Sequence, residues 1–112
     1  MEVTYTFRHV PSSEAVKTYA KEKLQKLQKY ARTPLVAAVV LSMERHLQKV
    51  EISLRSDDGR HAGAHESEDM YASIDLVVDK IDRQLRDARD KSATDRKKHS
   101  GGVTQLSGKS TK

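Results

Sequence analysis

The hydrophobic positions of the chain recur at two spacings, which distinguish strands from helices along its length. Over residues 3–7 apolar and polar residues alternate, which predicts a strand with one buried face. Pro11 ends this strand, and either Ser12 or Ser13 can cap a helix. Apolar residues then recur at three- and four-residue steps, which predicts one amphipathic helix over residues 12–31.

Three further strands are predicted in the middle of the chain. Residues 35–43 are apolar at nearly every position, which is typical of a strand at the centre of a sheet. Residues 49–55 alternate and predict a half-exposed strand, and the Asp-Asp-Gly sequence at 57–59 predicts a tight turn. Residues 60–66 predict a weaker fourth strand. Two alternatives are open for the inward face of that strand: Ala62 with Ala64, or His61 with Gly63 and His65.

The clearest amphipathic pattern comes last. Apolar residues from Met70 to Ala88 recur at helical spacing, which predicts a second helix over about 69–90. Residues 92–112 contain two adjacent glycines and few large apolar residues, which predicts a disordered basic tail after a domain of residues 1–91. The order β-α-β-β-β-α predicts an α+β fold, a two-layer sandwich with a four-stranded sheet and both helices on one face.

Composition limits the chain to one small domain. Its 112 residues are 36% hydrophobic and 33% charged, which allows one compact core. The absence of cysteine excludes a disulfide framework, a thiolate zinc site and a cysteine nucleophile. The longest apolar run has seven residues, too few to span a membrane, and residues 1–4 lack a secretion signal, so a cytoplasmic protein is expected.

The net charge of +5 is concentrated in two segments. Residues 12–32 hold six basic and two acidic residues, and residues 92–112 hold five and one, so each segment carries +4. A basic helix face in a soluble protein suggests a polyanion as partner, most often nucleic acid. A solvated surface that keeps the protein soluble is the alternative.

Basic side chains of both helices are the candidates for binding such a partner. At about 100° per residue, five cations of the first helix fall opposite its apolar stripe, and Lys23 lies at the edge of their arc. These five are Lys17, Lys21, Lys26, Lys29 and Arg32. The second helix carries Lys80, Arg83, Arg86, Arg89 and Lys91. The pairs Asp79–Arg83, Asp82–Arg86 and Asp87–Lys91 are four residues apart, so this helix alone could be a self-neutralised surface.

Residues that could support catalysis or metal binding form no recognisable pattern. His61 and His65 are four positions apart in a predicted strand, which places them about 13 Å from one another and excludes chelation of one ion. No nucleophile elbow or phosphate-binding glycine loop is present. The sequence therefore predicts no enzyme, no metal and no cofactor. Tyr30 and Tyr71 are candidates for stacking on bases.

One helix motif resembles a known family. The segments Asp69-Met70-Tyr71-Ala72, Ile74-Asp75, Asp79-Lys80 and Arg83-Gln84-Leu85 are similar to the helix of the bacterial ribosome hibernation-promoting factor and ribosome-associated inhibitor A family. That family is also described as sigma-factor modulation proteins. Basic residues of the first helix agree with the same family, and the resemblance covers about residues 1–91.

The resemblance implies both a fold and a function. The fold is that of a double-stranded-RNA-binding domain with an additional first strand. The family binds 16S rRNA of the small ribosomal subunit between head and body, blocks mRNA and the A- and P-site tRNAs, and inhibits translation in stationary phase or stress. The matching rRNA-binding positions are Lys17, Lys23, Lys26, Lys29, Lys80, Arg83 and Lys91, with Arg86 and Arg89 nearby.

The length of the chain resembles the short form of that family. We therefore expect a monomer in solution that contacts 16S rRNA and neighbouring ribosomal proteins, with a separate modulation factor needed for any pairing of ribosomes. Two other classes of function remain open: a general RNA-binding module that acts away from the ribosome, and a protein that modulates a transcription factor.

Overall fold

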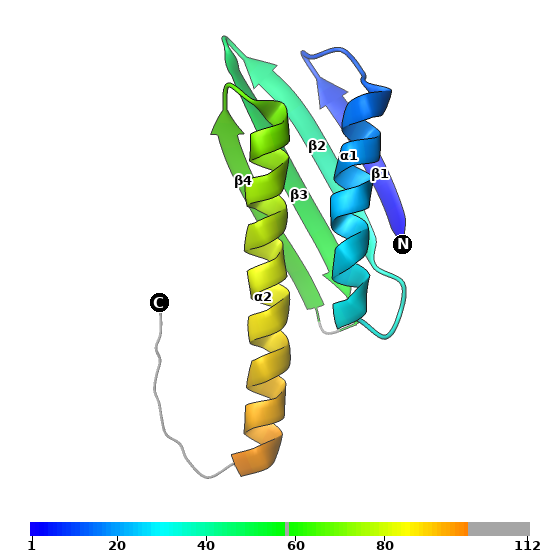
Figure 1. Cartoon of the computed structure of the whole chain (residues 1–112), viewed down its shortest axis with the longest axis vertical. Helices are drawn as coiled ribbons and strands as arrows, with labels where there is room; N and C mark the ends of the chain where they lie inside the picture. The colour runs from blue at the N-terminus through cyan, green and yellow to red at the C-terminus, as the bar shows by residue number, and fades with distance from the viewer. Residues whose placement is uncertain (58, 99–112) are drawn as a thin grey trace.

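The computed structural model describes residues 1–57 and 59–98, and residues 91–98 by their backbone alone. Its elements follow the predicted order β-α-β-β-β-α (Figure 1). They are β1 (Glu2–Arg8), α1 (Glu14–Gln25), the 3₁₀ helix η1 (Lys26–Tyr30), β2 (Val36–Glu44), β3 (Leu47–Ser56), β4 (Gly59–Ser67) and α2 (Met70–Lys98). Among these residues, no helix combines the length and the apolar composition needed to cross a membrane.

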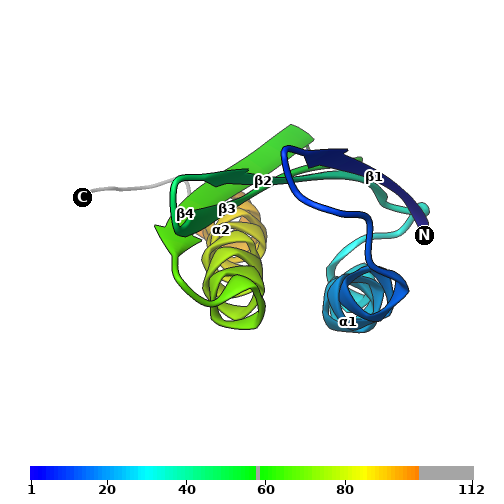
Figure 2. The same ribbon diagram turned by 90° about the horizontal axis from the view of Figure 1, so that it is seen from above.

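One sheet of four strands forms the first layer, in the order β1-β2-β3-β4. β1 pairs with β2 in parallel, and the other two pairs are antiparallel. Both helices cover the same face of this sheet, and the opposite face is uncovered (Figure 2). The two-layer α+β sandwich is therefore confirmed.

The core lies between the sheet and the helices. Ala37, Val39 and Leu41 of β2 point into it and are at most 1% exposed. The apolar run of this strand does not mean that both of its faces are buried, because Ala38 is exposed and Val40 only partly covered on the open face. β2 is an inner strand of the sheet, as predicted, but only one of its faces is covered.

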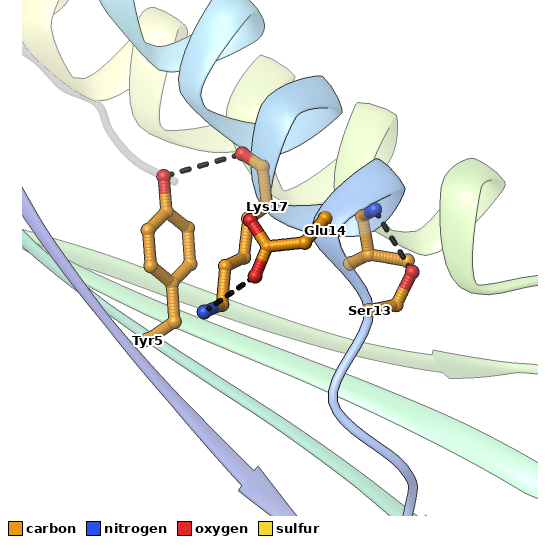
Figure 3. A network of polar contacts seen from close by, with 5 residues as sticks. Tyr5, Ser13, Glu14 and Lys17 are labelled. Carbon is orange, nitrogen blue, oxygen red and sulfur yellow. Dashed lines mark hydrogen bonds and ion pairs between the residues drawn. The ribbon is translucent and has the colours of Figure 1, made fainter.

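The first helix is shorter than predicted. Ser13 is its N-cap, since the Ser13 hydroxyl accepts a hydrogen bond from the backbone N–H of Val16 at 3.2 Å (Figure 3). The α-helix ends at Gln25, and the chain continues as the tighter helix η1, which keeps Leu27 buried. The prediction of one continuous helix over 12–31 is therefore wrong in its last turns.

A side-chain clamp fixes the chain after η1. The Gln28 amide donates to the Thr33 carbonyl at 2.8 Å, and its oxygen accepts from the N–H of Leu35 at 3.0 Å. These bonds hold the chain as it turns from the helical layer into β2. Periodicity alone could not reveal this change of pitch, because apolar side chains at 24 and 27 fit either type of helix.

The second helix is longer than predicted. Asp69 caps it, because Oδ1 of Asp69 accepts from the N–H groups of Tyr71 at 3.0 Å and Ala72 at 3.3 Å. The helix continues to Lys98, so residues 92–98, which were expected to belong to a disordered tail, are helical. No glycine or proline occurs between the cap residue Asp69 and Gly101. The sequence therefore contains no strong helix breaker at which α2 would have to end earlier. The remainder of the predicted tail, 99–112, lies outside the described residues.

β4 turns His61, Gly63 and His65 toward the helices, which resolves the open alternative for this strand. Their cross-strand partners are the buried residues Leu54, Ile52 and Val50 of β3. α2 lies close above Gly63: a Cβ atom there would be 3.4 Å from Val77 Cγ1. The close approach explains the glycine at this position.

Side chains of α2 also close the outer edge of β4. The Gln84 amide donates to the Ala62 carbonyl at 2.7 Å and accepts from the Ala62 N–H at 3.2 Å. Lys80 Nζ donates to the Ala64 carbonyl at 3.0 Å. These bonds occupy backbone groups that an unprotected edge strand would offer to another chain.

Candidate nucleic-acid interface

The predicted basic residues lie on the helical layer, but they do not form one row. Lys17 is on the side of α1 that faces β1, where Nζ lies 3.2 Å from Glu14 Oε2 and 5.8 Å from the centre of the Tyr5 ring (Figure 3). Lys80 is on the other side of the layer, where it bonds to β4. These two cations therefore occupy opposite flanks.

The other cations of the first helix lie nearer to α2 or point into solvent. Lys23 Nζ is 3.6 Å from Asp75 Oδ1 of α2 and 5.3 Å from the centre of the Tyr19 ring. Lys26 and Lys29 lie on η1 and are exposed, and Lys29 Nζ is 5.2 Å from the centre of the Tyr30 ring. The tighter pitch of η1 changes the direction of these two side chains from that expected for an α-helix.

The cations of α2 differ in how firmly they are held. The predicted pair Asp82–Arg86 is confirmed, with Arg86 Nε 3.2 Å from Asp82 Oδ1. Arg83 and Arg89 are exposed. Lys91 lies on α2, in the part described by its backbone alone.

A polar seam that was not predicted from the sequence joins the two helices. The Tyr19 hydroxyl donates to Asp75 Oδ1 at 2.7 Å, and the Tyr30 hydroxyl is influenced by the carboxylate of Asp82. The two carboxylates raise the pKa of the tyrosines beside them; desolvation adds to the effect, while the neighbouring cations oppose it.

The tyrosines therefore have structural partners. Tyr71 meets Tyr19 edge to face, with the ring centres 4.9 Å apart and the planes at 86°. Tyr30 and Tyr71, expected as groups for base stacking, both belong to the contact between the helices. A usable signal for the seam was the spacing of Asp75 and Asp82, which are two helical turns apart and so share a face.

Charge is divided along the helical layer rather than between its two helices. Both helices begin at the same end, so their first halves lie side by side (Figure 1). We name residues 12–22 and 68–79 the acidic end, which holds six carboxylates and two lysines. Residues 23–32 and 80–90 form the basic end, which holds eight cations and three carboxylates. Charges counted helix by helix do not reveal this division.

Histidines and carboxylates offer no metal centre in the described part of the chain. Residues 1–57 and 59–98 contain no group of three or more His, Asp or Glu side chains that could hold an ion. His61 and His65 are half-buried on β4, below α2. The basic end is therefore the strongest candidate site, and its chemistry suits phosphate groups.

Comparison with known proteins gives consistent results. The sequence model of the family described as "Sigma 54 modulation protein / S30EA ribosomal protein" matches residues 3–93. The chain is 34% identical over 91 residues to a "Ribosome hibernation promoting factor" of Pseudomonas putida, which covers 81% of this chain and 89% of the relative. It is 32% identical over 91 residues to the protein of the same name from Escherichia coli. This match covers 81% of this chain and 96% of the relative.

Solved structures share the fold. The N-terminal domain of Protein Y from Thermus thermophilus superposes with a TM-score of 0.74 at 29% identity, covering 80% of this chain and 100% of that domain. A ribosomal subunit interface protein from Coxiella burnetii superposes with a TM-score of 0.69 at 19% identity. The superposition covers 80% of this chain and 99% of that protein. The second likeness concerns the fold alone.

Proposed function

The chain belongs to the family of sigma 54 modulation proteins and S30EA ribosomal proteins, and from this membership we propose that it is a ribosome hibernation factor. It acts without catalysis and without a cofactor, by occupying a site on the small ribosomal subunit. The observation that carries the proposal is the basic end of the helical layer, where the cations of residues 23–32 and 80–90 belong to two helical segments that lie side by side.

The proposed ligand is 16S rRNA in the decoding channel. Lys23, Lys26 and Lys29 reach it from the first helix, and Arg83, Arg86 and Arg89 reach it from the second, with Lys91 beyond them. Lys17 and Lys80 contact the flanks of the site. Lysine and arginine bind phosphate oxygens and release condensed counterions, so the interaction supplies affinity without reading base sequence.

Inhibition follows from occupancy. A protein held in that channel excludes mRNA and the A- and P-site tRNAs, which stops translation in stationary phase or stress. The place of action is then the cytoplasm, where ribosomes work. For any pairing of ribosomes, the proposed partner is a separate modulation factor.

Sedimentation of the protein with purified ribosomes tests this function. The protein is expected to migrate with small subunits and whole ribosomes at low salt and to dissociate at high salt. In parallel, it is expected to inhibit translation in a purified system. Migration only at the top of the gradient would contradict the proposal and favour action away from the ribosome, on free RNA or on a transcription factor.

A further inference from the structure

An apolar cleft opens at the acidic end of the helical layer. It has a volume of about 570 Å³ and lies where the end of β1 meets the starts of α1 and α2. Its walls include Phe7, Val10, Val16 and Met70, all of which also contact the core. The cleft is large enough for one bulky side chain of another molecule.

The charges around this cleft are opposite in sign to those of the rRNA site. Two carboxylates, those of Glu68 and Asp69, are among the residues that line it, and no lysine or arginine is. Asp69 already caps α2, and Glu68 Oε2 lies 3.6 Å from His46 Nε2. Phosphate groups would be repelled here, whereas a cation beside an apolar group would be attracted.

Two apolar side chains of the acidic end are exposed on α2: Tyr71 lines the cleft, and Leu76 lies further along the helix, about 140° around it from Tyr71. Tyr71 and Leu76 are 40% and 44% exposed, and they are the large apolar side chains in the described residues that reach such exposure. Both belong to the acidic end. An aromatic or aliphatic group in a pocket with a polar rim is the arrangement that gives a protein interface its binding energy.

We propose that the acidic end is a docking surface for a basic segment of a ribosomal protein, whose bulky apolar side chain enters the cleft while a neighbouring lysine or arginine pairs with Glu68. The inference rests on the proposed function, because it places that segment beside the bound rRNA. The basic end then binds RNA and the acidic end binds protein, so the two ends together fix the direction in which the helical layer lies on the subunit.

Synthetic peptides test the chemistry of the cleft without ribosomes. The probe is the capped peptide Lys-Leu-Lys-Phe-Lys, and its controls are Glu-Leu-Glu-Phe-Glu and Lys-Ser-Lys-Ser-Lys. Only the first is expected to shift the NMR amide signals of Val10 and Tyr71 in a saturable way. Glu68→Lys is expected to weaken this binding about tenfold, whereas Glu51→Lys on the open sheet face leaves it unchanged. Equal binding of all three peptides, or no binding, would overturn the proposal.

Photo-crosslinking on purified small subunits tests the partner. A photoreactive benzoylphenylalanine replaces Ser12 at the cleft or, as the control, Gln25 within the basic end. Position 25 is expected to crosslink to rRNA, and position 12 to a ribosomal protein segment with a cation next to a bulky apolar residue. Crosslinks from both positions to rRNA alone would overturn the docking surface and leave the rRNA site intact. The absence of a crosslink between position 25 and rRNA would contradict the proposed function itself.

Discussion

Ile81 lies at the centre of the apolar face of α2 and is fully buried between that helix and the sheet. Truncation to alanine removes three carbon atoms and leaves a cavity that the neighbouring strands cannot fill completely. Ile81→Ala is therefore expected to lower the free energy of unfolding by about 2–4 kcal/mol, measured by urea denaturation. Arg83→Ala on the exposed side of the same helix is the control and should change it by less than about 0.5 kcal/mol.

Asp75 sets the ionisation of Tyr19. The carboxylate accepts the tyrosine proton in a hydrogen bond and opposes the negative charge of tyrosinate, so it raises the pKa of Tyr19. Asp75→Asn removes that charge, and the pKa of Tyr19 is expected to fall. Titration followed by the ultraviolet absorbance of tyrosinate measures this shift, and Tyr19→Phe identifies the affected group. Asp79→Asn, an exposed change on the same helix, should leave the titration unaltered.

The raised tyrosine pKa values also predict how stability depends on pH. Tyr5, Tyr19 and Tyr30 each have a pKa above the ordinary value of 10.0; desolvation is the main cause for Tyr5 and the neighbouring carboxylate for the other two. Above that value the unfolded chain loses protons that the native chain keeps. The stabilisation that these three tyrosines contribute is complete below about pH 10. It is lost as the pH rises through their pKa values in the native protein. Urea midpoints that did not fall above pH 10 would contradict this coupling.

At the scale of elements, η1 is the segment whose charge matters most for the proposed function. Lys26 and Lys29 are exposed there, so reversing both charges should leave the fold intact. The double variant Lys26→Glu with Lys29→Glu is expected to abolish inhibition of translation in a purified system. The matched control reverses two adjacent cations of the open sheet face, Arg55→Glu with Arg60→Glu, and should still inhibit. Equal loss of inhibition in both variants would remove η1 from the site.

The order and type of the elements could be predicted because each depends on a local pattern. Alternation identified β1 and β3, a nearly continuous apolar run identified β2, and the apolar stripe of α2 identified its helix. The change of pitch at Gln25 could not be predicted, since it depends on the Gln28 clamp to Thr33 and Leu35. The length of α2 was underestimated because a polar composition was interpreted as disorder, although nothing in it breaks a helix before Gly101.

The candidate site could be predicted only as a list of cations. Which of them lie together depends on how two helices far apart in sequence are placed on the sheet. The positions of Lys17 and Lys80 on opposite flanks, the bond between Tyr19 and Asp75, and the cleft at the acidic end all arise from that placement. None of these features has a local signature in the sequence.

For the whole molecule, the division of charge predicts how binding responds to salt. The basic end is expected to make most of the phosphate contacts, so the logarithm of affinity for small subunits should fall linearly with the logarithm of salt concentration. Each lost phosphate contact should reduce the slope by about 0.7–0.9, so Lys26→Ala with Lys29→Ala should reduce it by about 1.4–1.8. Glu68→Lys at the acidic end adds a cation outside the RNA contact and should not steepen the slope. Filter binding at several salt concentrations measures these slopes. If Glu68→Lys steepened the slope as much as the alanine variant reduced it, the whole helical layer would face rRNA, and a division into an RNA-binding end and a protein-binding end would be wrong.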